Sequence, residues 1–128
     1  MTKYILDSYA WIEYFIASEK GMEVKEIIER QSNEIYTSVI TVAEVCGKAK
    51  KENADHEGAY KKMLALSKIE GISPELARDA GLARHEIRKK VENFGLADAI
   101  VLLTARSLGA KVLTGDYHFK GFKEAVMI

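Results

Sequence analysis

Short apolar runs alternate along this chain with longer segments whose apolar residues recur every three or four positions. Tyr4-Ile5-Leu6 is one such run, and the spacing of Trp11, Ile12, Phe15 and Ile16 in the next segment is helical. Short runs of this kind are typical of buried strands, and the longer segments are typical of amphipathic helices. Strands that alternate with helices favour an α/β domain with a mainly parallel sheet.

The expected elements cover most of the chain. We expect strands at residues 4–6, 34–38, 68–73, 111–114 and 125–128. We expect helices from residue 8, over 22–30, from Thr41, over 55–66, over 74–91 and over 97–108. Pro74 suits the first position of its helix, and Gly109 suits the position after a last turn. The 128 residues are suited to one domain that spans 1–128.

Four carboxylates lie near the ends of predicted strands. Asp7 follows the first strand, and Asp116 lies just past the strand that ends at Thr114. Glu44 lies in the first turn of the helix after the second strand. Parallel sheets bind ligands beyond the carboxyl ends of their strands, so we expect these three acids on one edge. Asp98 begins a helix, and it reaches that edge if the long helix before it returns the chain there.

Each acid also has an ordinary structural interpretation. Asp7 can cap the first helix, and Thr41 with Glu44 has the spacing of a capping box. Asp98 suits the positive end of a helix, and Asp116 follows a glycine, as in many turns. Singly, each acid is better explained by these structural roles. Together, four acids on one edge repel one another unless a cation compensates their charge.

The four acids offer only carboxylate oxygens as metal ligands, and ligands of this kind favour Mg²⁺ or Mn²⁺. A structural zinc site is disfavoured, because the chain has one cysteine, Cys46, and its histidines, His56, His85 and His118, are scattered. His118 is nearest to the acids in sequence. We expect it at the surface or in contact with the side chains that bind the metal, rather than bound to the metal itself.

Charge and cysteine content limit the remaining classes. Lys and Arg equal Asp and Glu in number, so the net charge is zero and does not itself indicate nucleic-acid binding. Bound metal adds positive charge that this count omits. A single cysteine excludes an intrachain disulfide and favours the cytoplasm. The N-terminus reaches Asp7 too early for a signal peptide, and no apolar run is long enough to cross a membrane.

Four segments resemble the PIN domain: residues 4–15 (YILDSYAWIEYF), 38–44 (SVITVAE), 96–100 (LADAI) and 112–119 (VLTGDYHF). They look most like the toxin ribonuclease of VapBC-type toxin–antitoxin pairs, in the usual order and spacing. The resemblance implies a three-layer α/β/α PIN-like domain that cleaves RNA with the help of metal. It also implies a homodimer and a cognate antitoxin protein, whose inhibitory segment we expect beside residues 8–31.

By this resemblance Asp7, Glu44, Asp98 and Asp116 bind Mg²⁺ or Mn²⁺ and, with Thr114, form the catalytic site. Asp7 and Asp98 are the expected direct ligands. Asp116 completes the site directly or through water, and Glu44 acts through water or positions the nucleophile. Thr114 is expected to orient a carboxylate or a water molecule.

Contacts to the RNA backbone are marked less clearly. Ser8 and Lys48 are candidate substrate-binding residues, Lys48 because it lies one helical turn from Glu44. The same spacing is typical of an ordinary helix ion pair. One basic set comprises Lys48, Lys50 and Lys51, and a second comprises Arg84, Arg88, Lys89 and Lys90. A solvated helix face accounts for most of these basic residues.

Other classes of similar length fit less well. A phosphoacceptor receiver domain needs paired acids after its first strand, where Ser8 and Tyr9 follow Asp7. A haloacid-dehalogenase-type phosphatase needs a second aspartate at the position of Tyr9. A non-catalytic PIN-fold module that binds RNA or protein is the remaining alternative, and metal-dependent cleavage of a panel of RNAs distinguishes it from an enzyme.

Overall fold

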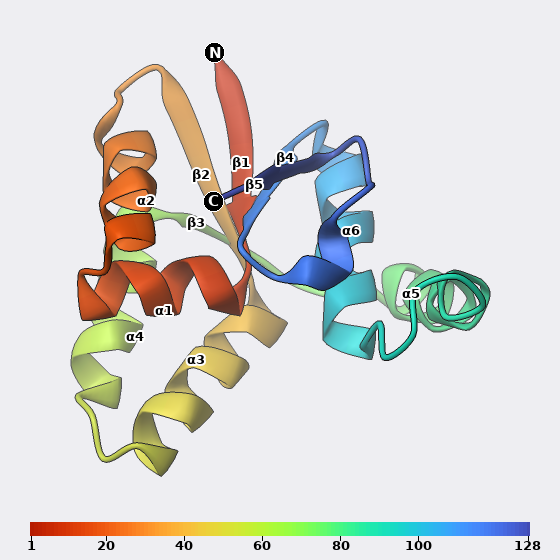
Figure 1. Ribbon diagram of the computed structural model, residues 1–128, viewed down its shortest axis with the longest axis horizontal. Helices are drawn as coiled ribbons and strands as arrows, with labels where there is room; N and C mark the ends of the chain where they lie inside the picture. Colours follow the sequence, from red (N-terminus) through yellow and green to blue (C-terminus); the bar gives the residue numbers. More distant parts are fainter.

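The computed structural model describes residues 1–128 as a five-stranded sheet flanked by helices (Figure 1). The strands are β1 (Thr2–Leu6), β2 (Asn33–Ser38), β3 (Lys68–Glu70), β4 (Lys111–Thr114) and β5 (Ala125–Met127). They are ordered β3-β2-β1-β4-β5, and all neighbouring strands are parallel. The predicted α/β fold is confirmed, with a sheet that is parallel throughout.

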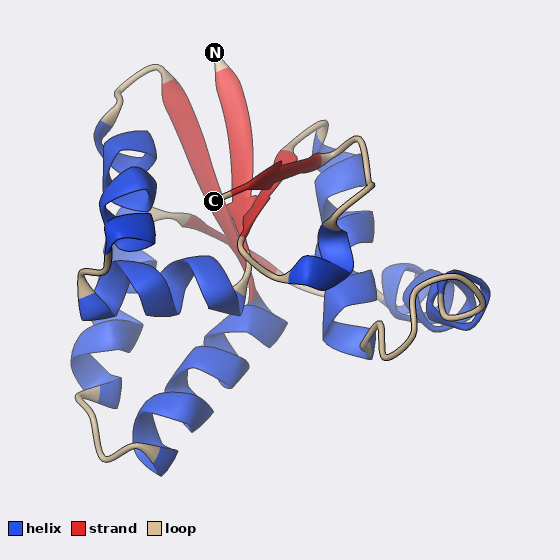
Figure 2. Cartoon of the chain, in the orientation of Figure 1, coloured by secondary structure: helices blue, strands red, loops and turns tan.

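Helices connect the strands and cover both faces of the sheet (Figure 2). They are α1 (Ser8–Ile16), α2 (Glu19–Glu29), α3 (Val39–Lys51), α4 (His56–Leu66), α5 (Pro74–Ile87), α6 (Leu96–Leu108) and the 3₁₀ helix η1 (Tyr117–Phe119). Figure 1 shows α1 to α4 on one side and α5 with α6 on the other. No helix is both long enough and apolar enough to cross a membrane.

The central strands are apolar on both faces because both faces are covered. Ile5 and Val112 pack in the core on the α6 side of the sheet. Their neighbours Leu6 and Leu113 point the other way, where they pack in the core that contains Trp11 of α1. Successive residues of a strand point to opposite faces, so each continuous apolar run supplies both cores.

Serine caps set several boundaries differently from our expectation. The helix expected at 22–30 begins earlier, because the Ser18 hydroxyl accepts a hydrogen bond of 3.0 Å from Gly21 N. The third strand ends before residue 73, because Ser73 instead caps α5 and accepts from Leu76 N at 3.1 Å. Capping satisfies backbone N–H groups that a helix start otherwise leaves free. The α5 helix also ends earlier, at Ile87, and residues 88–95 form a turning connection.

The capping-box interpretation of Thr41 and Glu44 is wrong. The helix begins at Val39 and is capped by Ser38, whose hydroxyl accepts from Ile40 N at 3.3 Å. Thr41 therefore lies inside α3 and is fully buried. Glu44 plays no part in capping this helix, so its side chain needs another explanation.

The strand order places a switch point between β1 and β4. These strands are neighbours, with Leu6 paired to Leu113. From β1 the chain continues to β2 on one side, whereas from β4 it continues to β5 on the other. A crevice for ligands is expected beyond the carboxyl ends of two such strands.

The α1 and α2 helices approach each other closely at Gly21. A Cβ atom at this buried position would overlap the backbone carbonyl group of Glu13. Only glycine lets the backbones of α1 and α2 pack this closely. The contact fixes the position of α1, whose first residue follows the switch-point acid Asp7.

Gly21→Ala should destabilise the protein by about 1–3 kcal/mol, the usual cost of overpacking, because the backbone of Glu13 cannot rotate away. Gly81 in α5 is the matched control, since a Cβ there meets no atom within 4 Å. Gly81→Ala should stabilise the helix by roughly 0.5–1 kcal/mol. Urea unfolding of both variants measures the difference, and equal effects would contradict the close approach.

Candidate functional site

Asp7 lies at the switch point, between the end of β1 and the start of α1. Its Oδ1 atom accepts a hydrogen bond of 2.9 Å from Ala10 N, so it does cap the first helix. Its Oδ2 atom accepts a hydrogen bond from the hydroxyl of Thr114 at the end of β4. The carboxylate is buried, with only 5% of the residue exposed. One buried acid therefore caps a helix and joins two strand ends.

Thr114 connects Asp7 to the next acid along the edge. Its hydroxyl donates to Asp7 and accepts from Asp116 N at 2.9 Å. Asp116 in turn caps η1, and its Oδ1 accepts from His118 N at 2.9 Å. A single chain of hydrogen bonds therefore runs from α1 across the switch point to η1.

At Gly115, between Thr114 and Asp116, the backbone lies close to the ring of Tyr9. A Cβ atom at position 115 would overlap the Tyr9 ring. The Tyr9 hydroxyl accepts a hydrogen bond of 3.1 Å from Lys20 Nζ, which helps to hold the ring in place. Gly115 is thus required by the packing around the acids, although in the sequence it resembles an ordinary turn residue.

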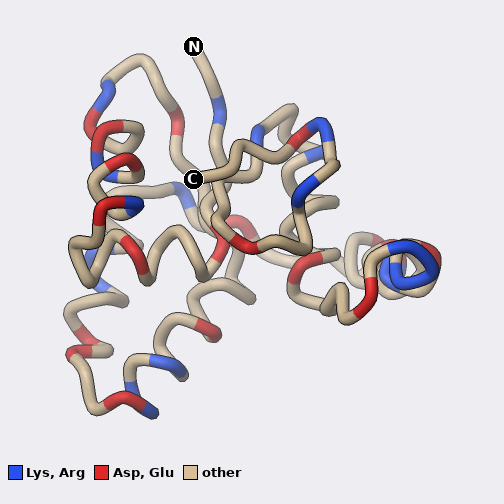
Figure 3. The backbone as a smooth tube through the Cα atoms, in the orientation of Figure 1, with Lys and Arg blue, Asp and Glu red and all other residues tan.

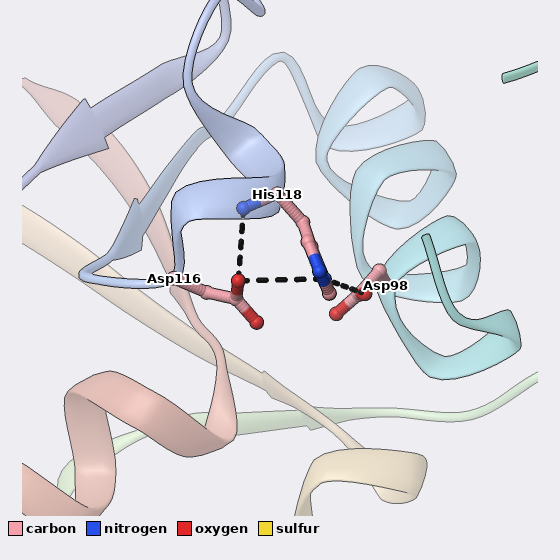
Figure 4. Close-up of side chains that lie close together, drawn as sticks. All are labelled: Asp98, Asp116 and His118. Carbon is pink, nitrogen blue, oxygen red and sulfur yellow. Dashed lines mark hydrogen bonds and ion pairs between the residues drawn. The ribbon is translucent and has the colours of Figure 1, made fainter. Parts of the chain in front are cut away.

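Asp98 approaches Asp116 from the start of α6 (Figure 4). Its Oδ2 accepts a hydrogen bond of 3.0 Å from Gly95 N, so it also stabilises the start of its helix. The connection before α6 does return the chain to the carboxyl edge, as the prediction for Asp98 required.

His118 lies between these two carboxylates, in contact with both, as one of the two expected positions required. Its Nδ1 atom is 3.4 Å from Asp98 Oδ2 and 3.4 Å from Asp116 Oδ1 (Figure 4). Ligand atoms of the three side chains all lie within 4.8 Å of one another. The sequence signal for His118 is its place two residues after Asp116, in a turn that folds back over the site.

Glu44 faces the same cluster from α3. Desolvation raises the pKa of Glu44, and the negative charges of Asp98 and Asp116 raise it further. The Ser8 hydroxyl has the opposite effect on this pKa, which places Ser8 beside Glu44. Glu44 is the most exposed of the four predicted acids, and it lies outside the tightest group of ligand atoms.

Burial dominates the electrostatics of the cluster. It raises the pKa of Asp7 from 3.8 to about 7, although hydrogen bonds from Thr114 and Ala10 oppose the shift. Burial also raises the pKa of Asp98, and the charge of Asp116 adds to this effect. Carboxylates that are crowded and desolvated favour a cation between them. The carboxylate oxygens and the single imidazole fit a divalent metal ion.

Lys48 does not extend toward the acids. Its Nζ atom lies 3.0 Å from Glu52 Oε1, one helical turn further along α3. The ordinary ion-pair interpretation therefore describes Lys48, with Glu52 as its partner instead of Glu44. The same residues line a groove between α1, α3 and α4.

The family of this protein is identified from a match over nearly the whole chain. The PIN domain profile matches residues 4–125. This chain belongs to the PIN domain family. No individually curated protein is significantly similar to it in sequence.

Solved structures of VapBC-type toxins resemble this PIN domain over nearly its full length. A toxin–antitoxin complex from Klebsiella pneumoniae is 26% identical, with a TM-score of 0.71 over 96% of this chain and 95% of that one. DNA-bound VapBC from Salmonella typhimurium is 22% identical, with a TM-score of 0.73 and coverage of 100% and 98%. VapC20 from Mycobacterium tuberculosis, described as a sarcin-ricin loop cleaving toxin, is 16% identical, with a TM-score of 0.71 and coverage of 98% and 99%. The resemblance to this group of toxins is confirmed.

The buried Asp7 should make the stability of this PIN domain depend on pH in EDTA. Its folded pKa of about 7 exceeds its ordinary value of 3.8, so ionisation opposes folding increasingly as pH rises between these values. Asp7→Asn removes that ionisation. At about pH 8 the variant should be more stable than wild type by up to ~4 kcal/mol, and the difference should fade toward about pH 4.

Asp55 supplies the control for this experiment. It is an exposed aspartate that caps α4 and accepts a hydrogen bond of 2.9 Å from Gly58 N. Asp55→Asn keeps a capping residue, and its effect should be small at both pH values. Urea unfolding in EDTA measures both differences, and a stability difference for Asp7→Asn that stays constant with pH would argue against the buried ionisation.

Proposed function

We propose that this PIN domain is a Mg²⁺- or Mn²⁺-dependent endoribonuclease and the toxin of a toxin–antitoxin pair. The observation that carries the proposal is the cluster at the switch point, where ligand atoms of Asp98, Asp116 and His118 lie within 4.8 Å of one another. RNA as the substrate is supported by the similarity to VapC20, a sarcin-ricin loop cleaving toxin. We place the protein in the cytoplasm, where such a substrate is found.

In this proposal the acids hold the cation from several elements. Asp98 and Asp116 point toward one another from α6 and from the end of β4 (Figure 4). Asp7 completes the set, since each carboxylate oxygen keeps a lone pair beyond the hydrogen bond that it accepts. A divalent ion held there would lower the pKa of nearby water and offset charge on the phosphate.

The other side chains orient the reactants. The Thr114 hydroxyl holds Asp7 and Asp116 in fixed relative positions through its two hydrogen bonds. Glu44 is an exposed residue, and its pKa is raised by partial desolvation of its carboxylate and by the nearby acids, which suits it to accept a proton from an attacking water molecule. Ser8 lies beside Glu44 and is available to contact the substrate.

RNA cleavage should require Mg²⁺ or Mn²⁺ and should stop in EDTA. Asp116→Asn should reduce cleavage by at least ~100-fold, because a charged ligand is lost. Asp79→Asn is the control, since Asp79 lies on α5 and pairs with Arg78 at the surface. A labelled RNA panel measures cleavage, and full activity of folded Asp116→Asn would contradict the assignment.

Metal binding also has a readout that does not depend on activity. A ligand that binds only the folded state raises the melting temperature. Mn²⁺ should therefore stabilise wild type and Asp79→Asn more than it stabilises Asp116→Asn. A module that binds RNA without cleaving it, which is the alternative function, would show RNA binding and no cleavage under any metal condition.

The toxin role in this proposal requires an antitoxin, and a groove on one side of the molecule can accept one. The groove has a volume of about 430 Å³ and is lined mostly by apolar residues of α1, α3 and α4, together with charged residues that include Lys48 and Glu52. Ile16 on its rim is 64% exposed. Similar structures include toxin–antitoxin complexes. We place the antitoxin's inhibitory segment here, because α1 leads from this groove to Asp7 and a basic side chain can follow it to the acids.

Ile16→Asp should weaken binding of the cognate antitoxin by at least ~10-fold, because it puts a charge into an apolar contact. Leu82→Asp is the matched control, since Leu82 is 65% exposed on α5 and lies outside the groove. Both variants should keep metal-dependent cleavage. Titration calorimetry with the antitoxin compares them, and equal losses would exclude this groove. Light scattering of the free toxin tests the homodimer that we also propose.

A further inference from the structure

Positive charge gathers at the end of α5 and in the connection that follows it (Figure 3). Residues 84–90, which we call the α5 basic segment, contain one acid, Glu86, and four cations, Arg84, Arg88, Lys89 and Lys90. The chain as a whole has a net charge of zero, so this excess is local. A local excess of this kind attracts an anionic partner.

Most of this charge is not committed to other residues. Lys89 forms an ion pair with Glu86, with 3.0 Å between Nζ and Oε2. Arg88 and Lys90 are exposed and form neither an ion pair nor a side-chain hydrogen bond. Arg84 is half-buried, and its Nε atom has no hydrogen-bond partner. The segment thus presents cations that are available to a ligand.

The connection holds these cations in a compact turn. Lys90 N and Val91 N both donate to Ile87 O, at 2.9 and 2.8 Å, and Phe94 N donates to Val91 O at 3.3 Å. Ile87 and Val91 pack against the core on the α6 side of the sheet. The basic side chains are therefore carried by backbone that is fixed on the body of the protein.

The same connection leads directly to the acidic cluster. Phe94 is fully buried and packs edge-on against Phe119 of η1, with 5.6 Å between the ring centroids. The next residue, Gly95, donates its N–H to Asp98. Through these contacts the connection that follows the α5 basic segment reaches the cluster on both its η1 side and its α6 side.

The other basic set is placed less favourably. The α3 helix begins at the carboxyl edge and leads away from it for 13 residues, a length of roughly 20 Å. Lys48 is paired with Glu52, and Lys50 and Lys51 lie at the far end of α3. The α3 lysines therefore lie away from the acids, whereas the α5 basic segment continues directly into the connection that contacts the cluster.

We propose that the α5 basic segment binds the backbone phosphates of the RNA strand whose scissile bond lies at the acidic cluster. This inference rests on the proposed ribonuclease function. Unpaired acids repel phosphates, so a substrate strand needs cationic contacts close to them. Arg88 and Lys90 supply these contacts, and the strand crosses the start of α6 to reach them.

Fluorescence anisotropy with a labelled single-stranded RNA of mixed sequence tests this inference in EDTA, where binding is measured without cleavage. The double variant Arg88→Gln/Lys90→Gln should raise Kd by about tenfold at low salt. For this variant the slope of log Kd against log salt concentration should be smaller by about 1.4, because each of the two lost phosphate contacts lowers the slope by ~0.7. Glu92→Gln, which removes an exposed acid beside the segment, should tighten binding.

Lys50→Gln/Lys51→Gln is the matched control, because it removes the same charge from two exposed lysines that form no ion pair. This variant should change Kd by less than about twofold, since it affects only the distant field. Equal weakening by both double variants, no weakening by either, or no RNA binding by wild type overturns the inference. Binding that depends on Arg88 and Lys90 without cleavage in Mn²⁺ would instead refute the ribonuclease proposal alone.

Discussion

A carboxylate buried at the end of β1 is the constraint on which the rest of the site depends. Asp7 is desolvated, which disfavours its charge, and it is stabilised by donors from Ala10 and Thr114. These hydrogen bonds require β1, β4 and α1 to meet at one point, and they offset only part of the cost of burying the acid. Further negative charge from Asp116 and Asp98 is then brought close to a group that is already costly to ionise. The fold and the chemistry of the site are linked at Asp7, because the contacts that join β1, β4 and α1 also bring the acids close together.

The layered architecture could be predicted because its signals are local and repeated. Continuous apolar strands and amphipathic helices mark a covered parallel sheet, and the ends of β1 and β4 carry acids that the fold must bring to one edge. Helix starts were harder to predict, because Thr37, Ser38 and Thr41 are all side chains able to cap α3. The choice of Ser38 depends on where the β2 strand stops pairing with its neighbours. That pairing is a tertiary contact, which the local sequence does not contain.

The four acids could be located from strand ends and from the family resemblance, but their partners could not. Lys48 has an acid one turn away in either direction, Glu44 and Glu52, and the spacing alone does not choose between them. The structure selects Glu52, at 3.0 Å. The contacts of His118 could not be predicted for a related reason. Its position depends on the short η1 turn, which folds the chain back so that the imidazole faces both Asp98 and Asp116.

The two edge strands have a consequence for how copies of this protein behave toward one another. β3 and β5 have three residues each, so each outer edge offers little unpaired backbone to a neighbouring sheet. A chain with a formal net charge of zero has little electrostatic repulsion to keep molecules apart near neutral pH. Short edges provide a protection that charge does not, because a strand of this length is a poor template for edge-to-edge pairing and aggregation. Extending either edge strand would therefore threaten solubility before it disturbed the fold.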